Sequence, residues 1–143
     1  MTPETTRALI SQFMKALQNR DIAAALACLS ADVIHDVNQG GERRAGRDRF
    51  EAYLARMQHH YDEEISDTVV FVSDDGSRGA VEYNLTGIYK QTEDGMPPAS
   101  GQSYQLPAAF FFAVEGGVFT RVTAYYNLTD WITQVVAAPA TLQ

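Results

Sequence analysis

The chain has 143 residues, of which 45% are hydrophobic and 20% are charged, and this suits a folded protein with a sizeable core. Its net charge of −7 argues against nucleic-acid and anionic membrane partners, which require a basic surface. We expect a single domain over residues 1–136 and a flexible tail over 137–143.

Cys28 is the only cysteine, so the sequence predicts no intrachain disulfide. No charged leader precedes an apolar run, and no apolar run reaches the length of about 18 residues typical of a membrane helix. We therefore expect a cytoplasmic protein without a membrane partner.

Three helices are predicted in the first 60 residues. Thr2-Pro3-Glu4 is typical of a helix start, and apolar residues then recur at helical spacing over 9–17. Asp21 is suited to cap a second, alanine-rich helix that ends near residue 29. A third helix is expected over about 47–60. Its apolar stripe consists of Phe50, Tyr53, Leu54, Met57 and Tyr61.

A short strand is expected between the second and third helices, over residues 33–39. Alternation places Asp36 and Asn38 on one face of this strand and His35 on the other. Gly40-Gly41 supplies a turn, and residues 43–45 are expected to return as a second short strand.

The sequence pattern of the second half of the chain predicts mainly β-strands. Strands are predicted over 68–72, 78–91, 104–115 and 118–126, separated by turn residues such as Gly116-Gly117. A short helix over 131–136 follows. Helices followed by an antiparallel meander predict an α+β fold.

Three segments resemble the NTF2-like superfamily, and within it ketosteroid isomerase and the SnoaL-like polyketide cyclases. The first segment runs from Asn19-Arg-Asp through the alanine-rich helix to the strand that ends at Asp36. The second is the glycine-containing entry to the third helix, over 44–50, and the third is the strand over 121–127. The resemblance implies a cone. In it, three N-terminal helices pack on a curved, mainly antiparallel sheet that encloses an apolar pocket, and a short C-terminal helix follows.

The same resemblance implies a set of site residues. Asp36 corresponds to the general base of the isomerase, and Tyr83, Tyr126 and Asn38 are candidates to hold the enolate oxygen of a substrate. The substrate pocket would be lined by Phe13, Tyr53, Leu54, Met57, Val81, Leu85, Tyr89, Leu106, Ala108, Phe110, Phe112, Val122 and Ala124.

The sequence departs from the isomerase at the oxyanion hole. The isomerase uses a tyrosine and a protonated aspartic acid there, and these positions correspond to Phe13 and about Phe110. Neither phenylalanine donates a hydrogen bond, and the loss of one oxyanion donor costs about 10²–10³ in rate. Tyrosines in the pocket are therefore the candidates for replacement donors.

The leading hypothesis is a cofactor-independent enzyme in which Asp36 transfers a proton on a small hydrophobic carbonyl compound, as a double-bond isomerase or an aldol-type polyketide cyclase. The alternative is a non-catalytic module of the same fold, for hydrophobic-ligand binding or dimerisation. An epoxide hydrolase is disfavoured, since the predicted inward faces carry one acid and no arginine.

No phosphate-binding loop, dinucleotide fingerprint or metal-ligand spacing is present in the sequence. We expect no cofactor and no metal, and a small hydrophobic molecule as the partner. A homodimer is expected through the outer sheet face, where Phe111, Ala113 and Tyr125 are apolar.

Overall fold

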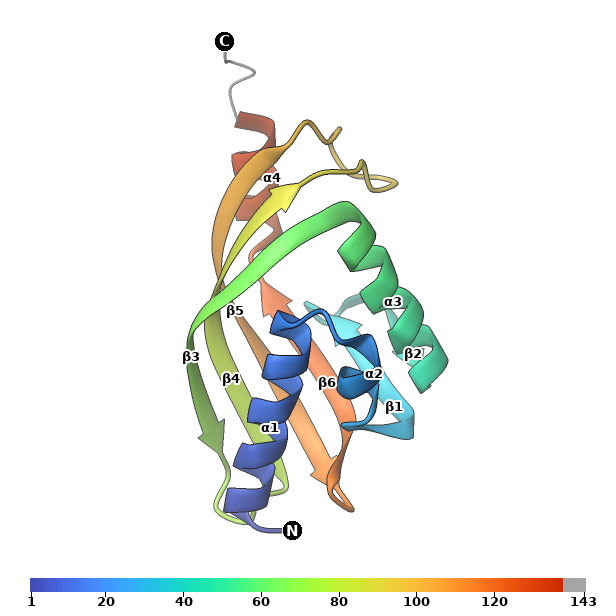
Figure 1. Cartoon of the computed structure of the whole chain (residues 1–143), viewed down its shortest axis with the longest axis vertical. Helices are drawn as coiled ribbons and strands as arrows, with labels where there is room; N and C mark the ends of the chain where they lie inside the picture. The colour runs from blue at the N-terminus through green and yellow to red at the C-terminus, as the bar shows by residue number, and fades with distance from the viewer. Residues whose placement is uncertain (138–143) are drawn as a thin grey trace.

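The computed structural model describes residues 1–137, apart from the side chains of residues 41 and 42. In this part of the chain a six-stranded curved sheet is covered by helices (Figure 1). The elements in chain order are α1 (Pro3–Gln18), α2 (Ile22–Leu26), β1 (Leu29–Val37), β2 (Gly40–Ala45), α3 (Arg47–His60), β3 (Tyr61–Val72), β4 (Arg78–Tyr89), β5 (Gln102–Glu115), β6 (Val118–Tyr126) and α4 (Leu128–Ala137). The predicted tail begins at Ala137, the last residue of α4, and otherwise lies outside the described residues.

The strand order is β2-β1-β6-β5-β4-β3. The meander from β3 to β6 is antiparallel throughout, and β1 pairs with β6 in parallel. Figure 1 shows α1 crossing one face of the sheet and α3 lying over the end formed by β1 and β2. This arrangement confirms the predicted α+β class, the mainly antiparallel sheet, the three N-terminal helices and the C-terminal helix.

The first two helices begin where their capping residues predict. The Thr2 hydroxyl accepts a hydrogen bond from the Thr5 amide, and an Asp21 carboxylate oxygen accepts one from the Ala24 amide. α2 ends at Leu26, earlier than predicted, because the Cys28 carbonyl accepts a hydrogen bond from the Phe119 amide. The chain therefore joins the sheet as β1 instead of continuing the helix.

β3 begins earlier than predicted. α3 ends at His60 and β3 starts at Tyr61 with no intervening turn residue. The extended backbone of Tyr61 makes this change of direction, and β3 then pairs with β4 from Tyr61 to Val72. The segment 61–67, expected to precede the strand, therefore belongs to the sheet.

The core lies between α1 and the sheet. Phe13 of α1 is fully buried, and its ring is met edge-on by Phe50, Phe110, Phe112 and Phe119, with centroids 5.5–6.3 Å away. A second apolar cluster at the other end of the sheet includes Trp131 of α4. The space between these two clusters is the cavity described next.

Candidate active site

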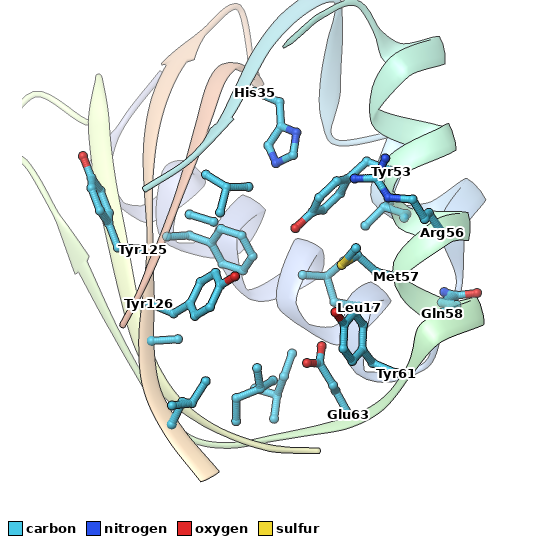
Figure 2. Close-up of a pocket in the computed structure, with 18 of the residues that line it drawn as sticks. Leu17, His35, Tyr53, Arg56, Met57, Gln58, Tyr61, Glu63, Tyr125 and Tyr126 are labelled. Atoms are coloured by element: carbon cyan, nitrogen blue, oxygen red, sulfur yellow. The ribbon is translucent and has the colours of Figure 1, made fainter. Parts of the chain in front are cut away.

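A cavity of about 400 Å³ lies between the concave sheet face, α1 and α3. Figure 2 shows its side chains converging from both sides, with Tyr53 and Met57 from α3 opposite Tyr126 from β6. This volume falls in the range of small-molecule sites.

Most of the predicted pocket residues line this cavity. They are Phe13, Tyr53, Leu54, Met57, Tyr83, Leu85, Leu106, Ala108, Phe110, Ala124 and Tyr126. Val81, Tyr89, Phe112 and Val122 do not line it; they are buried on the same face but pack into the apolar clusters. The Tyr89 hydroxyl is already engaged, since it donates a hydrogen bond to the Pro97 carbonyl and accepts one from the Glu93 amide.

The expected orientation of β1 is wrong. His35 and Val37 line the cavity, whereas Asp36 does not. In the parallel pairing with β6, His35 lies beside Val122 and Val37 beside Ala124, and Asp36 lies beside Thr123. Because Val33 is also fully buried, the face with His35 is the apolar one and turns inward.

Asp36 is buried on the outer side of the sheet instead. One of its carboxylate oxygens lies 3.1 Å from Arg43 Nε, and its side chain is 2% exposed. Its other oxygen is buried without a hydrogen-bond partner in the described part of the chain. This position does not bring the Asp36 carboxylate to a substrate in the cavity.

Asn38 also lies outside the cavity. Its backbone has a φ of 56°, and its side-chain oxygen accepts a hydrogen bond from the Tyr126 amide at 2.8 Å. Asparagine tolerates this left-handed conformation better than most residues. Asn38 therefore joins the end of β1 to β6, and its amide is not directed at a substrate.

His35 extends from β1 into the cavity wall (Figure 2). Its ring centroid lies 4.4 Å from that of Phe50 and 4.5 Å from that of Tyr53, and the residue is 1% exposed. Burial, followed by the charge of Arg44, lowers the pKa of His35 from 6.5 to about 4. The imidazole is therefore neutral at pH 7.

His35→Phe is expected to make folding stability less dependent on pH. As the pH falls below 6.5 the unfolded chain binds a proton at His35, whereas the folded chain resists this until about pH 4. Between pH 6.5 and about pH 4, protonation of His35 in the unfolded chain should therefore lower the unfolding free energy of the wild type by about 3 kcal/mol. The variant lacks the imidazole and should not show this decrease. Urea unfolding across this range measures the difference.

The control for this experiment is His59→Gln, which removes an exposed imidazole at the end of α3. This variant should keep the pH dependence of the wild type. An equal loss of stability on acidification in the wild type and in His35→Phe would contradict the expectation.

Two carboxylates line the cavity, and one of them is Glu63, which is not among the predicted site residues. It lies in one row with Gly87 on β4 and Tyr104 on β5. Since Gly87 has no side chain, the Tyr104 ring lies across it; a Cβ atom there would be 2.3 Å from Tyr104 Cζ. The Tyr104 hydroxyl reaches over the strand and donates a 2.5 Å hydrogen bond to Glu63.

Burial raises the pKa of Glu63 above its ordinary value, and the hydrogen bond from Tyr104 partly opposes this increase. The bond occupies Oε2, and Oε1 has no hydrogen-bond partner among the atoms that the structure describes. Figure 2 shows the Glu63 carboxyl group directed into the cavity. A carboxyl group of this kind is suited to take up and return a proton.

Three phenols accompany Glu63 in the cavity wall: Tyr53, Tyr83 and Tyr126. Burial is the first cause that raises the pKa of each phenol, and the charge of Glu63 adds to it in all three. They therefore remain protonated donors at pH 7. In the described part of the chain no hydrogen bond occupies their hydroxyl groups, and Figure 2 shows those of Tyr53 and Tyr126 directed towards the middle of the cavity.

The expectation that the cavity contains no arginine is also wrong. Arg20, Arg44 and Arg56 contribute to its wall. Arg20 forms an ion pair with Asp62 at 2.8 Å, and Arg56 lies 3.4 Å from Glu93, which also accepts a hydrogen bond from the Tyr61 hydroxyl. The second acid of the cavity, Glu93, is thus held by two partners at its rim.

No group of three or more histidine, cysteine, aspartate or glutamate side chains is placed to hold a metal ion within the described residues. No helix in that part of the chain combines the length and hydropathy required to cross a bilayer.

Comparisons with known proteins agree with this architecture. The model of the SnoaL-like domain family matches residues 10–122. The crystal structure of a candidate polyketide cyclase from Pseudomonas putida KT2440 is 45% identical, with 94% of this chain and 98% of that chain covered and a TM-score of 0.89. No curated protein matches the chain.

More distant structures share the fold. A candidate ketosteroid isomerase from Kribbella flavida DSM 17836 is 25% identical, covers 89% of this chain and 82% of its own, and has a TM-score of 0.62. An NTF2-like protein from Burkholderia xenovorans LB400 is 15% identical, with 96% and 98% covered and a TM-score of 0.73. The fold is therefore NTF2-like, as the sequence predicts.

Proposed function

The chain belongs to the family of SnoaL-like domains, and we propose that it is a cofactor-independent enzyme that moves a proton on a small, largely apolar carbonyl compound. The reaction is a double-bond isomerisation or an aldol-type cyclisation. The observation that carries this proposal is the position of Glu63 beside three unoccupied phenols in one apolar cavity. The 45% identity to a candidate polyketide cyclase supports the same class of reaction.

Glu63 acts as the base. Its carboxylate takes a proton from the carbon next to the substrate carbonyl, and the enolate oxygen that forms accepts hydrogen bonds from Tyr53 and Tyr126. In an isomerisation, the Glu63 carboxylic acid returns the proton to the far carbon of the conjugated system. In a cyclisation, the enolate carbon forms a bond to a second carbonyl carbon, and the acid gives its proton to the resulting alkoxide.

Deuterium exchange tests this proposal without knowledge of the natural substrate. Unsaturated and β-dicarbonyl compounds are incubated with the protein in D₂O, and loss of the α-proton signal is followed by NMR. Fluorescence of Trp131, which lines the cavity, reports binding in parallel. We expect catalysed exchange for at least one compound that binds. Compounds that bind without any catalysed exchange would overturn the proposal and favour the non-catalytic ligand-binding module.

The arginines and acids in the cavity favour epoxide hydrolysis as a second candidate. Glu63 would take a proton from a water molecule that attacks an epoxide carbon, and a phenol would protonate the oxygen released as the ring opens. Formation of a diol from cyclohexene oxide, followed by gas chromatography, separates this reaction from proton exchange on ketones.

We also propose that the protein forms a homodimer through the outer face of its sheet. Several large apolar side chains are exposed there: Val69 by 42%, Phe71 by 52%, and Phe111 and Ile88 by 46% each. Phe71 and Phe111 flank Ala80 in one row across β3, β4 and β5, and an exposed apolar surface of this kind favours association. Light scattering should give twice the monomer mass for the wild type, and Phe111→Glu should lower it to the monomer mass.

Val136→Glu, at an exposed apolar position on α4, is the control for this charge and should remain dimeric. A wild-type monomer at micromolar concentration would contradict the dimer.

A further inference from the structure

Arg44 differs from the other arginines of the cavity wall. It is half-buried and lines the cavity, yet it forms no ion pair with any side chain that the structure describes, a set that leaves out those of residues 41 and 42. Its guanidinium carbon lies 5.6 Å from the centre of the Tyr53 ring. This cation–π contact engages the face of the guanidinium group, and its N–H donors make no hydrogen bond to another described side chain. In a chain with a net charge of −7, an unpaired arginine in an apolar cavity requires a physical explanation.

His35 lies directly opposite Arg44 in the pairing of β1 with β2. Its residue exposure is 1%, and its Nδ1 is buried without a hydrogen-bond partner in the described part of the chain. Buried polar atoms in native proteins are normally satisfied, so an orphaned imidazole nitrogen beside an unpaired guanidinium indicates a missing polar partner. Both groups belong to the wall of the same cavity.

A carboxylate would satisfy both groups. The planar guanidinium of arginine matches the two oxygens of a carboxylate, and an uncharged imidazole offers one N–H donor. The guanidinium stays charged at any physiological pH, so the pair always carries a positive charge.

Tyr53, itself one of the proposed donors, contacts both members of this pair: its ring centroid lies 4.5 Å from that of His35 and 5.6 Å from the Arg44 guanidinium carbon. Arg44 stacks on its ring, and its hydroxyl is directed towards Tyr126 across the cavity (Figure 2). A molecule anchored at Arg44 therefore extends along Tyr53 towards the phenols and Glu63. We propose that Arg44 and His35 form an anion subsite that binds a carboxylate of the substrate, so that the protein acts on an unsaturated or keto acid and not on a neutral ketone.

This inference rests on the proposed function for its account of the reacting end, but binding alone can test it. 1-Cyclohexenecarboxylate and 1-acetylcyclohexene have nearly the same shape and differ in charge. Isothermal titration calorimetry of the wild type should show at least about tenfold tighter binding of the carboxylate, since hydrogen bonds to charged groups are the stronger ones. Equal affinity for the two compounds would overturn the subsite.

Two variants locate the effect. Arg44→Gln should weaken binding of the carboxylate by about 10- to 100-fold and leave binding of the ketone nearly unchanged. Arg47→Gln removes the same charge from an exposed position outside the cavity and should change neither. If Arg44→Gln does not fold, Arg44→Lys can replace it. Lysine keeps the positive charge but lacks the planar pair of N–H donors, so it should still weaken binding of the carboxylate. Equal losses in the Arg44 and Arg47 variants would show general charge attraction and contradict the subsite.

The two proposals can fail separately. Glu63→Gln should still bind the carboxylate through Arg44. Tight, Arg44-dependent binding without proton exchange on any compound would support the anion subsite and contradict the proposed catalytic activity. Catalysed exchange on neutral ketones without preferential binding of the carboxylate would support the catalytic activity and contradict the anion subsite.

Discussion

Glu63→Gln is expected to lower kcat/KM for proton exchange by about 10²–10⁴, the usual contribution of a positioned acid or base. Glutamine keeps the shape of the side chain and still accepts the hydrogen bond from Tyr104, but it cannot take a proton from carbon. The melting temperature should change little, because the variant removes a charge whose burial is itself unfavourable. Rates come from NMR exchange and stability from circular dichroism.

Glu64→Gln is the matched control, since the adjacent side chain is exposed and does not line the cavity. It should have wild-type activity. The wild type should also lose activity on acidification, with an apparent pKa above the ordinary value for glutamate, because burial favours the protonated form of Glu63. Activity that persists in Glu63→Gln would remove the proposed base.

The sequence around Glu63 gives no signal that the helix ends and a strand begins, so Glu63 was not predicted as a site residue. Tyr61 continues the apolar stripe of α3 at helical spacing, and no glycine, proline or turn motif separates it from the helix. In the structure the helix ends at His60 and the strand begins at once. Only the alternation of Tyr61, Glu63 and Ile65, all of which line the cavity, would have indicated that the strand starts before residue 68.

The reversal of β1 has a different cause. The pattern over 33–39 predicts two faces correctly, but which one points inward depends on the neighbouring strand. The face with Val33, His35 and Val37 is the more apolar, and it lies against the inward residues of β6. The resemblance to ketosteroid isomerase favoured Asp36 instead, because that residue aligns with the catalytic base. Here the likeness of sequence conflicted with hydrophobic patterning, and patterning was correct.

Features determined by neighbouring residues were predicted more accurately. The turn at Gly116-Gly117 has positive φ at both residues, and it joins β5 and β6 in an antiparallel pair whose register shifts once, between Ala113 and Val114. That register places Phe110 opposite Ala124 and Ala108 opposite Tyr126, and all four line the cavity as expected. Arg44 belongs to β2 and Glu63 to β3, which are the two opposite edge strands of the sheet, so no local motif reveals that they share a cavity.

Tyr53→Phe and Tyr126→Phe should each lower kcat by about 10²–10³, the cost of losing one oxyanion donor. Both hydroxyl groups are directed into the cavity (Figure 2), and burial together with the charge of Glu63 raises their pKa. They therefore stay protonated and can donate to the enolate oxygen. Because the negative charge on that oxygen develops mainly in the transition state, KM should change much less than kcat.

Tyr125→Phe is the control for removal of a phenol, since Figure 2 shows the Tyr125 hydroxyl directed away from the cavity and its ring packs 5.4 Å from that of Phe111. It should have wild-type kcat. The double variant of Tyr53 and Tyr126 should lose less than the product of the two single effects if both phenols hold the same oxygen. Fully multiplicative losses would place the two donors on different atoms of the substrate. A wild-type kcat in both single variants would rule out these phenols as the replacements for the donors missing at Phe13 and Phe110.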